Sequence, residues 1–207
     1  MSYIKNPMEI ENTSFDIIGS EMGDHNFSKD ELKIVKRVIH TTADFEYMDL
    51  LDISKDAIEQ AKKILKKNPI IYTDTNMALS GINKRALEKL KGKAICYVNL
   101  EEVHKEAKEK EITRSMAAVE KACEDNVDIF VFGNAPTALF KLKELIKEKK
   151  ANPKLIVAVP VGFVGASESK ENLEELNIPY IRVKGRKGGS TVAASIINAL
   201  MYMVVER

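Results

Sequence analysis

The middle and C-terminal parts of the chain alternate short apolar runs with longer amphipathic stretches. Each run is rich in β-branched residues and nearly continuous in hydrophobicity, as a strand covered on both faces must be. The runs that we expect to be strands are Pro69–Asp74, Lys93–Asn99, Ile129–Asn134, Leu155–Gly162 and Pro179–Val183. Because helical patterns separate them, the sequence predicts a three-layer α/β/α fold with a mainly parallel, Rossmann-like sheet of about five strands.

The N-terminal quarter departs from this alternation. A capping box at Ser28–Glu31 opens a helix whose apolar positions follow helical spacing. Two β-branched threonines follow His40 and are poor helix formers, so we expect His40 at the C-terminal end of that helix, beside a loop. The region is expected to pack over the sheet as a helical extension of one domain that spans residues 1–207.

Composition excludes several classes of protein. The 207 residues are 44% hydrophobic and 30% charged, as in a globular protein rather than a disordered or collagen-like chain. Lys plus Arg total 32 and Asp plus Glu total 31, and this balance argues against a nucleic-acid partner held by bulk charge. The most apolar stretch, Val192–Val205, is too short for a bilayer and predicts a buried helix, with no role at a membrane.

The cysteines and the N-terminus indicate a compartment. Cys96 and Cys123 stand apart among apolar neighbours, which predicts buried, reduced thiols. The first residues contain no apolar segment of the kind found in signal peptides. We therefore expect a cytoplasmic protein.

Candidate chemistry gathers in the loops that follow the expected strands, where open parallel sheets bind ligands. These loops combine glycines with hydroxyl residues ahead of helix N-termini, a pattern that exposes backbone N–H groups to anions. They are Thr73–Met77, Gly133–Thr137, Gly162–Ser167 and Lys184–Ser190. Each loop alone is equally consistent with an ordinary capped turn, but four together favour a polyanionic small-molecule site. Within that pattern Asn134 and Thr137 are candidate ligand contacts, and no loop spells a nucleotide-binding glycine motif.

Few other side chains stand out. The three histidines have no metal-ligand spacing, so no protein-bound metal is expected. His25 and His104 are expected at the surface. His40 is either a helix-capping histidine or a functional one. Arg114 and Ser115 open an expected helix, where an arginine can bind a carboxylate with two parallel hydrogen bonds or remain a surface residue.

Seven motifs, in order along nearly the whole chain, resemble those of the precorrin-8X methylmutase family, also called cobalt-precorrin-8 methylmutase, of corrin biosynthesis. The motifs are Ile10–Phe15 (IENTSF), Arg37–Asp44 (RVIHTTAD), Asp74–Met77 with Gly81, Thr113–Ser115, Val131–Phe140 (VFGNAPTALF), Val159–Ser167 (VPVGFVGAS) and Gly185–Ser190 (GRKGGS). Phe45 is a departure, because the family pattern has proline there.

The resemblance implies an isomerase that moves a methyl group within ring C of the macrocycle by a 1,5-sigmatropic shift, yielding hydrogenobyrinate or cobyrinate. It assigns catalysis to His40 and substrate contacts to Ser14 and Arg37. It also implies a homodimer that needs no added cofactor, any cobalt being carried by the macrocycle. The carboxylates of such a substrate suit the N–H-rich loops, and its flat ring suits apolar contacts from Met77, Phe140 and Phe163.

A proton donor is the natural role for His40 under this resemblance. Protonating a ring nitrogen makes the conjugated macrocycle electron-poor and eases the methyl shift, and histidine exchanges protons near neutral pH. The helix C-terminus, and Asp44 if it lies within reach, would favour the protonated imidazole, whereas Arg37 would oppose it. Two alternatives stay open, a non-catalytic tetrapyrrole carrier and a nucleotide-dependent oxidoreductase on the same fold. The sequence is equally compatible with a cobalt-bearing and a metal-free substrate.

Overall fold

The apolar runs of the sequence form the sheet. The computed structural model describes residues 3–206, and in that part of the chain the sheet has six strands in the order β1-β6-β5-β4-β2-β3. The strands are β1 (Leu51–Ile53), β2 (Ile70–Thr73), β3 (Lys93–Ile95), β4 (Ile129–Phe132), β5 (Leu155–Ala158) and β6 (Tyr180–Val183). All neighbours from β6 to β3 are parallel, and β1 pairs antiparallel with β6 at one edge.

The central strands contribute to two hydrophobic cores. Successive residues of a strand point to opposite faces of the sheet. In β4, Ile129 and Val131 belong to the core on one face, whereas Phe130 and Phe132 belong to the core on the other. All four side chains are buried, which explains why the run is continuously apolar rather than alternating.

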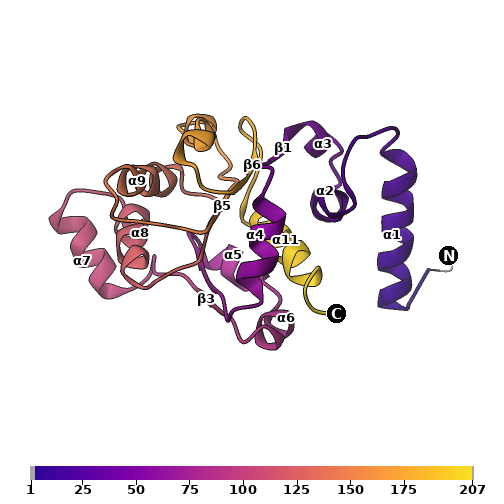
Figure 1. Ribbon diagram of the computed structural model, residues 1–207, viewed down its shortest axis with the longest axis horizontal. Helices are drawn as coiled ribbons and strands as arrows, with labels where there is room; N and C mark the ends of the chain where they lie inside the picture. The colour runs from indigo at the N-terminus through magenta and orange to yellow at the C-terminus, as the bar shows by residue number, and fades with distance from the viewer. Residues whose placement is uncertain (1–2, 207) are drawn as a thin grey trace.

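Helices cover both faces of the sheet, which confirms the predicted three-layer arrangement. One face carries α4 (Ala57–Leu65), α5 (Asn76–Gly81), α6 (Lys84–Lys89) and α11 (Ser190–Tyr202). The other carries α7 (Glu101–Glu109), α8 (Arg114–Glu124) and α9 (Pro136–Lys147), with the short α10 (Ala166–Lys170) and η1 (Leu173–Leu176) against α9. In Figure 1 the α7–α9 layer lies on the left and α11 on the right of the sheet.

The N-terminal extension lies one layer further out than expected. α2 (Lys29–Thr42) packs on α11, which already covers the sheet, and α1 (Pro7–Glu21) packs on α2 at the right-hand end of Figure 1. The short α3 (Tyr47–Leu50) then leads into β1. The helix predicted near the C-terminus is buried as α11, and no helix within residues 3–206 is long and apolar enough to cross a membrane.

Two details of the sheet differ from the sequence-based expectation. The antiparallel β1 is not predicted, because three residues, of which Leu51 is buried and the other two are partly buried, are too few to give a period-2 pattern. The strands expected at Lys93–Asn99 and Leu155–Gly162 end earlier, at Ile95 and Ala158. In the second case Pro160 has no N–H with which to continue the ladder.

Candidate active site

His40 lies on the exposed C-terminal turn of α2, as predicted. The capping box is present, since Ser28 Oγ accepts the backbone N–H of Glu31 (3.3 Å) and the Glu31 carboxylate accepts that of Ser28 (2.7 Å). The helix ends in a left-handed residue, Ala43 (φ 53°). The two threonine hydroxyls beside His40 donate to backbone carbonyls one turn back in the helix, so they are already engaged.

An open cavity of about 420 Å³ lies beside His40. Its lining comes from α1, from the end of α2 and from the turn that follows α2, namely Ser14, Ile17, Ile18, Glu21, Ile39, His40, Ala43 and Phe45. The His40 ring stacks on Phe15, with 5.2 Å between ring centroids and 20° between planes. Ser14 Oγ donates to the Ile10 carbonyl (2.7 Å), which leaves the hydroxyl oxygen able to accept a hydrogen bond. The structure therefore brings Ser14 and His40 into one cavity, which Phe45 also lines.

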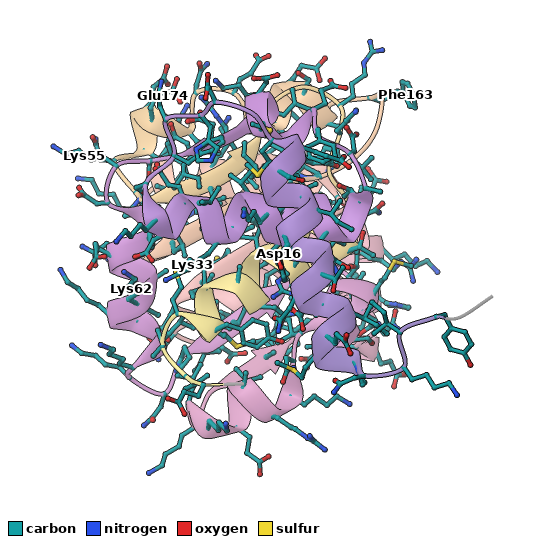
Figure 2. All side chains as sticks on the ribbon, turned by 90° about the vertical axis from the view of Figure 1, so that its right-hand side faces the viewer. Asp16, Lys33, Lys55, Lys62, Phe163 and Glu174 are labelled. Carbon is teal, nitrogen blue, oxygen red and sulfur yellow. The ribbon has the colours of Figure 1, made fainter. Side chains whose placement is uncertain are left out.

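Arg37 is one turn before His40 but faces a different space. Its guanidinium forms an ion pair with Glu11 (2.8 Å) and lies 4.6 Å from the Phe15 ring centroid and 5.5 Å from that of Tyr202. It belongs to a second cavity of about 280 Å³ lined by Phe15, Lys29, Leu32, Lys33, Lys36, Arg37, Ala199 and Tyr202. In Figure 2, which looks onto α1, Lys33 lies beside that helix. Phe15 thus contacts both Arg37 and His40.

Asp44 pairs with a lysine and not with His40. Its carboxylate pairs with the ammonium of Lys187, which comes from the loop between β6 and α11. This hydrogen bond holds the pKa of Asp44 below its usual range. No hydrogen bond joins Asp44 to His40 among the described residues, and Lys187 engages the Asp44 carboxylate instead.

The remaining predicted site residues form a separate group on the opposite face of the sheet. Arg114 and Ser115 open α8, and Thr113 just before them shares a hydrogen bond with Thr137 at the start of α9 (3.1 Å between hydroxyl oxygens). Asn134 is exposed in the loop that leads to α9. Arg114 Nη1 lies 3.2 Å from His104 Nε2. His104 is exposed as expected, as is His25. Figure 1 shows α8 and α9 at the opposite end of the molecule from α1 and α2.

The backbone N–H groups of the loop after β4 already bind a carboxylate of the protein itself, that of Asp74. Asp74, at the end of β2, is buried and accepts the backbone N–H groups of Gly133 (2.9 Å), Asn134 (2.8 Å) and Ala135 (2.7 Å). Burial raises the pKa of this carboxyl in spite of the three hydrogen bonds. The expectation that these N–H groups receive substrate carboxylates is therefore wrong for this loop, because Asp74 already fills them. An aspartate at the end of a buried strand is the sequence signal that points to this arrangement.

The loops after β5 and β6 are joined by a buried lysine that sequence reasoning missed. Lys170 Nζ donates to the carbonyls of Pro160 (3.0 Å) and Lys187 (2.9 Å), and burial lowers its pKa to about 8. The segment around it (SESKEN) is polar and resembles an ordinary surface turn. Phe163, on the loop after β5, is 81% exposed, and Met77 is 67% exposed. Phe140, the third expected apolar contact, is partly buried.

Comparison with known proteins identifies the chain's relatives. The family model described as precorrin-8X methylmutase matches residues 9–203. The chain belongs to this family. It is 50% identical to the cobalt-precorrin-8 methylmutase of Salmonella typhimurium over the whole of both chains, and 36% identical to the precorrin-8X methylmutase of Pseudomonas aeruginosa over 97% of each. The solved structure of the precorrin-8x methyl mutase from Thermus thermophilus superposes with a TM-score of 0.88 at 38% identity, covering 95% of this chain and 96% of the other.

Membership confirms the predicted family and, with it, an isomerase of the methylmutase class in cobalamin biosynthesis. It removes the oxidoreductase alternative. Within residues 3–206, no group of three His, Cys, Asp or Glu side chains is placed to hold a metal ion. The absence of a cofactor requirement stays a prediction.

Proposed function

We propose that this chain moves a methyl group between adjacent carbons of ring C of the precorrin-8 macrocycle, giving hydrogenobyrinate or cobyrinate. One carbon–carbon bond breaks as another forms within a single molecule, so the balance includes no oxidant, reductant or group donor. The observation that carries the proposal is the His40 cavity, in which an exposed imidazole stacked on Phe15 faces Ser14 in a chain of this family.

In this proposal His40 lends a proton to the macrocycle and takes it back after the shift. An isomerisation has no net proton change, so one group suffices for both steps. His40 lies on the last turn of α2, where the last backbone carbonyls carry partial negative charge. Ser14 and Arg37 bind the substrate, Arg37 by exchanging its internal partner Glu11 for a substrate carboxylate.

The test is the variant His40→Ala. We expect it to fold and to bind product, but to lose turnover by roughly 10²–10⁴-fold, the range typical of general acid–base catalysis. The matched control is His25→Ala, which removes another exposed histidine from the α1–α2 loop and is expected to retain full turnover. Near-normal turnover of His40→Ala at neutral pH would remove this residue from the mechanism. Product binding by the wild-type protein without turnover would instead support a tetrapyrrole carrier.

We also infer that the preferred substrate carries cobalt. The relatives named cobalt-precorrin-8 methylmutase include those from Salmonella typhimurium (50% identical) and Leptospira interrogans (44%), whereas those named precorrin-8X methylmutase are 36% and 34% identical. Parallel assays with cobalt-bearing and metal-free substrate, followed by the visible spectrum, test this. A higher kcat/KM with the metal-free substrate would contradict it.

A homodimer in the cytoplasm completes the proposal. Met8, Ile10 and Ile17 are exposed apolar side chains on the outermost helix, a feature of association surfaces. Because Arg114 and His40 lie on opposite faces of one chain, a second copy is also a way to bring the two groups to one substrate. Light scattering at micromolar concentration should give twice the chain mass, and a monomer would refute the inference.

The cytoplasmic location is supported by the two free, partly buried cysteines.

A further inference from the structure

Lys187 adds an ion-pair link between two segments that the pairing of β1 with β6 and a hydrogen bond from the Lys184 N–H to the Leu50 carbonyl (2.8 Å) already bring together. Its ammonium donates to the carboxylates of Asp44 and of Glu46, the latter at 2.6 Å. Lys187 belongs to the loop between β6 and α11, whereas the two acids lie in the turn that follows α2. That turn begins three residues after His40.

The backbone of Lys187 is itself firmly held. Its carbonyl accepts a hydrogen bond from the buried Lys170 (2.9 Å). Gly188 follows with a φ of 146°, and a Cβ there would lie 2.1 Å from the Val159 carbonyl oxygen, so only glycine fits. The N–H of Gly189 donates to the same oxygen (2.9 Å). Lys187 therefore extends from a rigid base at the end of β5.

The end of α2 is anchored on its inner side, where Val38 and Ile39 are buried, but the side chain of His40 is exposed. The side chain of His40 makes no hydrogen bond within residues 3–206, and its orientation depends on the stack with Phe15 and on the helix that carries it. The helix terminates in a left-handed alanine, a conformation that costs about 1–2 kcal/mol for a residue with a Cβ. Glu46 donates its N–H to Asp44 (3.0 Å), so the two acids form a compact turn that Lys187 holds from outside.

We propose that Lys187 is a positioning residue for the methylmutase reaction. Through Asp44 and Glu46 it fixes the C-terminal turn of α2, and with it the His40 ring, relative to the loops at the carboxyl ends of β5 and β6. This inference rests on the proposed role of His40. It explains why a lysine in a glycine-rich loop turns its side chain toward internal carboxylates rather than toward a polyanionic substrate.

The primary test is Lys187→Gln, with Asp44→Asn as a second variant that removes the same pair from the other side. We expect kcat to fall by about 10–100-fold, as when a group that orients a reacting side chain is lost, with KM changed less than about twofold. Lys187→Arg keeps the charge and should recover most of the lost kcat. An unchanged kcat, a loss confined to KM, or no recovery in the arginine variant would overturn the proposal.

Lys62, in α4, provides a matched control because it contacts the opposite end of α2. Its ammonium likewise bridges two carboxylates, those of Asp30 in α2 and Glu59 (2.8 Å) in α4, and it appears at the left in Figure 2. Lys62→Gln also removes two ion pairs, one with Asp30 of α2 and one with Glu59 within α4, but leaves the His40 turn intact. We expect full kcat in this variant. Equal losses of kcat in the Lys62 and Lys187 variants would mean that general stability, not positioning, is responsible.

Imidazole NMR spectra separate this inference from the proposed function. The chain has three histidines, so the ring signals of His40 can be assigned by their absence in His40→Ala. In Lys187→Gln the His40 signals should shift while those of His25 and His104 stay in place, and Lys62→Gln should shift none of them. This readout needs no turnover. Unshifted His40 signals in Lys187→Gln would refute the positioning role even if the enzyme is active.

Discussion

Asp74 illustrates how one buried side chain decides the role of a whole loop. The sequence Gly133–Thr137 has the composition of an anion-binding turn, and the structure shows that it does bind an anion, the protein's own carboxylate. A buried charge requires hydrogen-bond partners, and three backbone N–H groups supply them to the Asp74 carboxylate. The loop thereby holds Asn134 and the start of α9 in place rather than offering its N–H groups to a ligand.

We therefore expect Asp74→Asn to destabilise the protein. The amide keeps the shape of the side chain but turns an NH₂ group toward backbone N–H donors, leaving at least one donor without an acceptor. The free energy of unfolding should fall by about 1–3 kcal/mol, measured by urea unfolding. Asp16→Asn, on the exposed surface of α1, is the control and should change stability by less than about 0.5 kcal/mol. Equal stability of the two variants would show that the three hydrogen bonds contribute nothing.

Arg37 and Arg114 differ in a way that substitution by lysine can resolve. Arg37 lies between two aromatic rings and next to a cavity, whereas Arg114 is exposed beside His104. Lysine keeps the charge but loses the planar pair of donors and the stacking. If both arginines hold substrate carboxylates, each Arg→Lys change should weaken product binding by about tenfold, equivalent to about 1.4 kcal/mol. Absorbance titration measures this, and unchanged product affinity in both variants would contradict the assignment.

At the scale of elements, the sequence predicts what depends on local periodicity. The five parallel strands, the capping box of α2 and the helix end at His40 all follow from patterns within about fifteen residues. The antiparallel β1 does not, because its pairing with β6 joins residues far apart in the chain. The hydrogen-bond partners of Lys170 and Lys187 are not predicted from the sequence for the same reason. Their contacts connect separate loops, and composition gives no sign of which charge lies inward.

The end of α2 allows a prediction at this scale. Ala43 adopts a left-handed conformation that glycine reaches without steric cost. Replacing Ala43 by Gly should therefore raise the free energy of unfolding, by about 0.5–1 kcal/mol after the larger chain entropy of glycine is counted. Urea unfolding measures the change. A loss of stability would mean that contacts of the Ala43 methyl group in the His40 cavity outweigh the backbone term.

For the whole molecule, the sheet separates two groups of predicted site residues. Ser14, Arg37 and His40 lie on the outer helices of one face, and Arg114, Ser115, Asn134 and Thr137 lie on the other face. The two groups are also separate along the chain, because residues 14–40 precede residues 114–137. Sequence order alone does not say on which face of the sheet each group lies. The loops after β5 and β6 lie between them, at the carboxyl edge of the sheet. Lys170 lies at their junction and donates hydrogen bonds to a carbonyl of each loop.

Lys170 should give the protein an unusual dependence of stability on alkaline pH. Burial lowers its pKa from the ordinary 10.5 to about 8 in the folded state. Between these two values the unfolded chain binds a proton that the folded chain does not, so this group raises the free energy of unfolding as pH rises, by at most about 1.4 kcal/mol per pH unit. Below pH 8 both states are protonated and the contribution is constant. The neutral amine still donates to the carbonyls of Pro160 and Lys187, so deprotonation does not release the two loops.

Urea unfolding of the wild type and Lys170→Met at pH 7, 8, 9 and 10 isolates the effect, because other groups that titrate at high pH are common to both proteins. The difference between them should be flat up to pH 8 and should then rise in favour of the wild type. A difference that stays constant from pH 7 to pH 10 would show that Lys170 keeps an ordinary pKa.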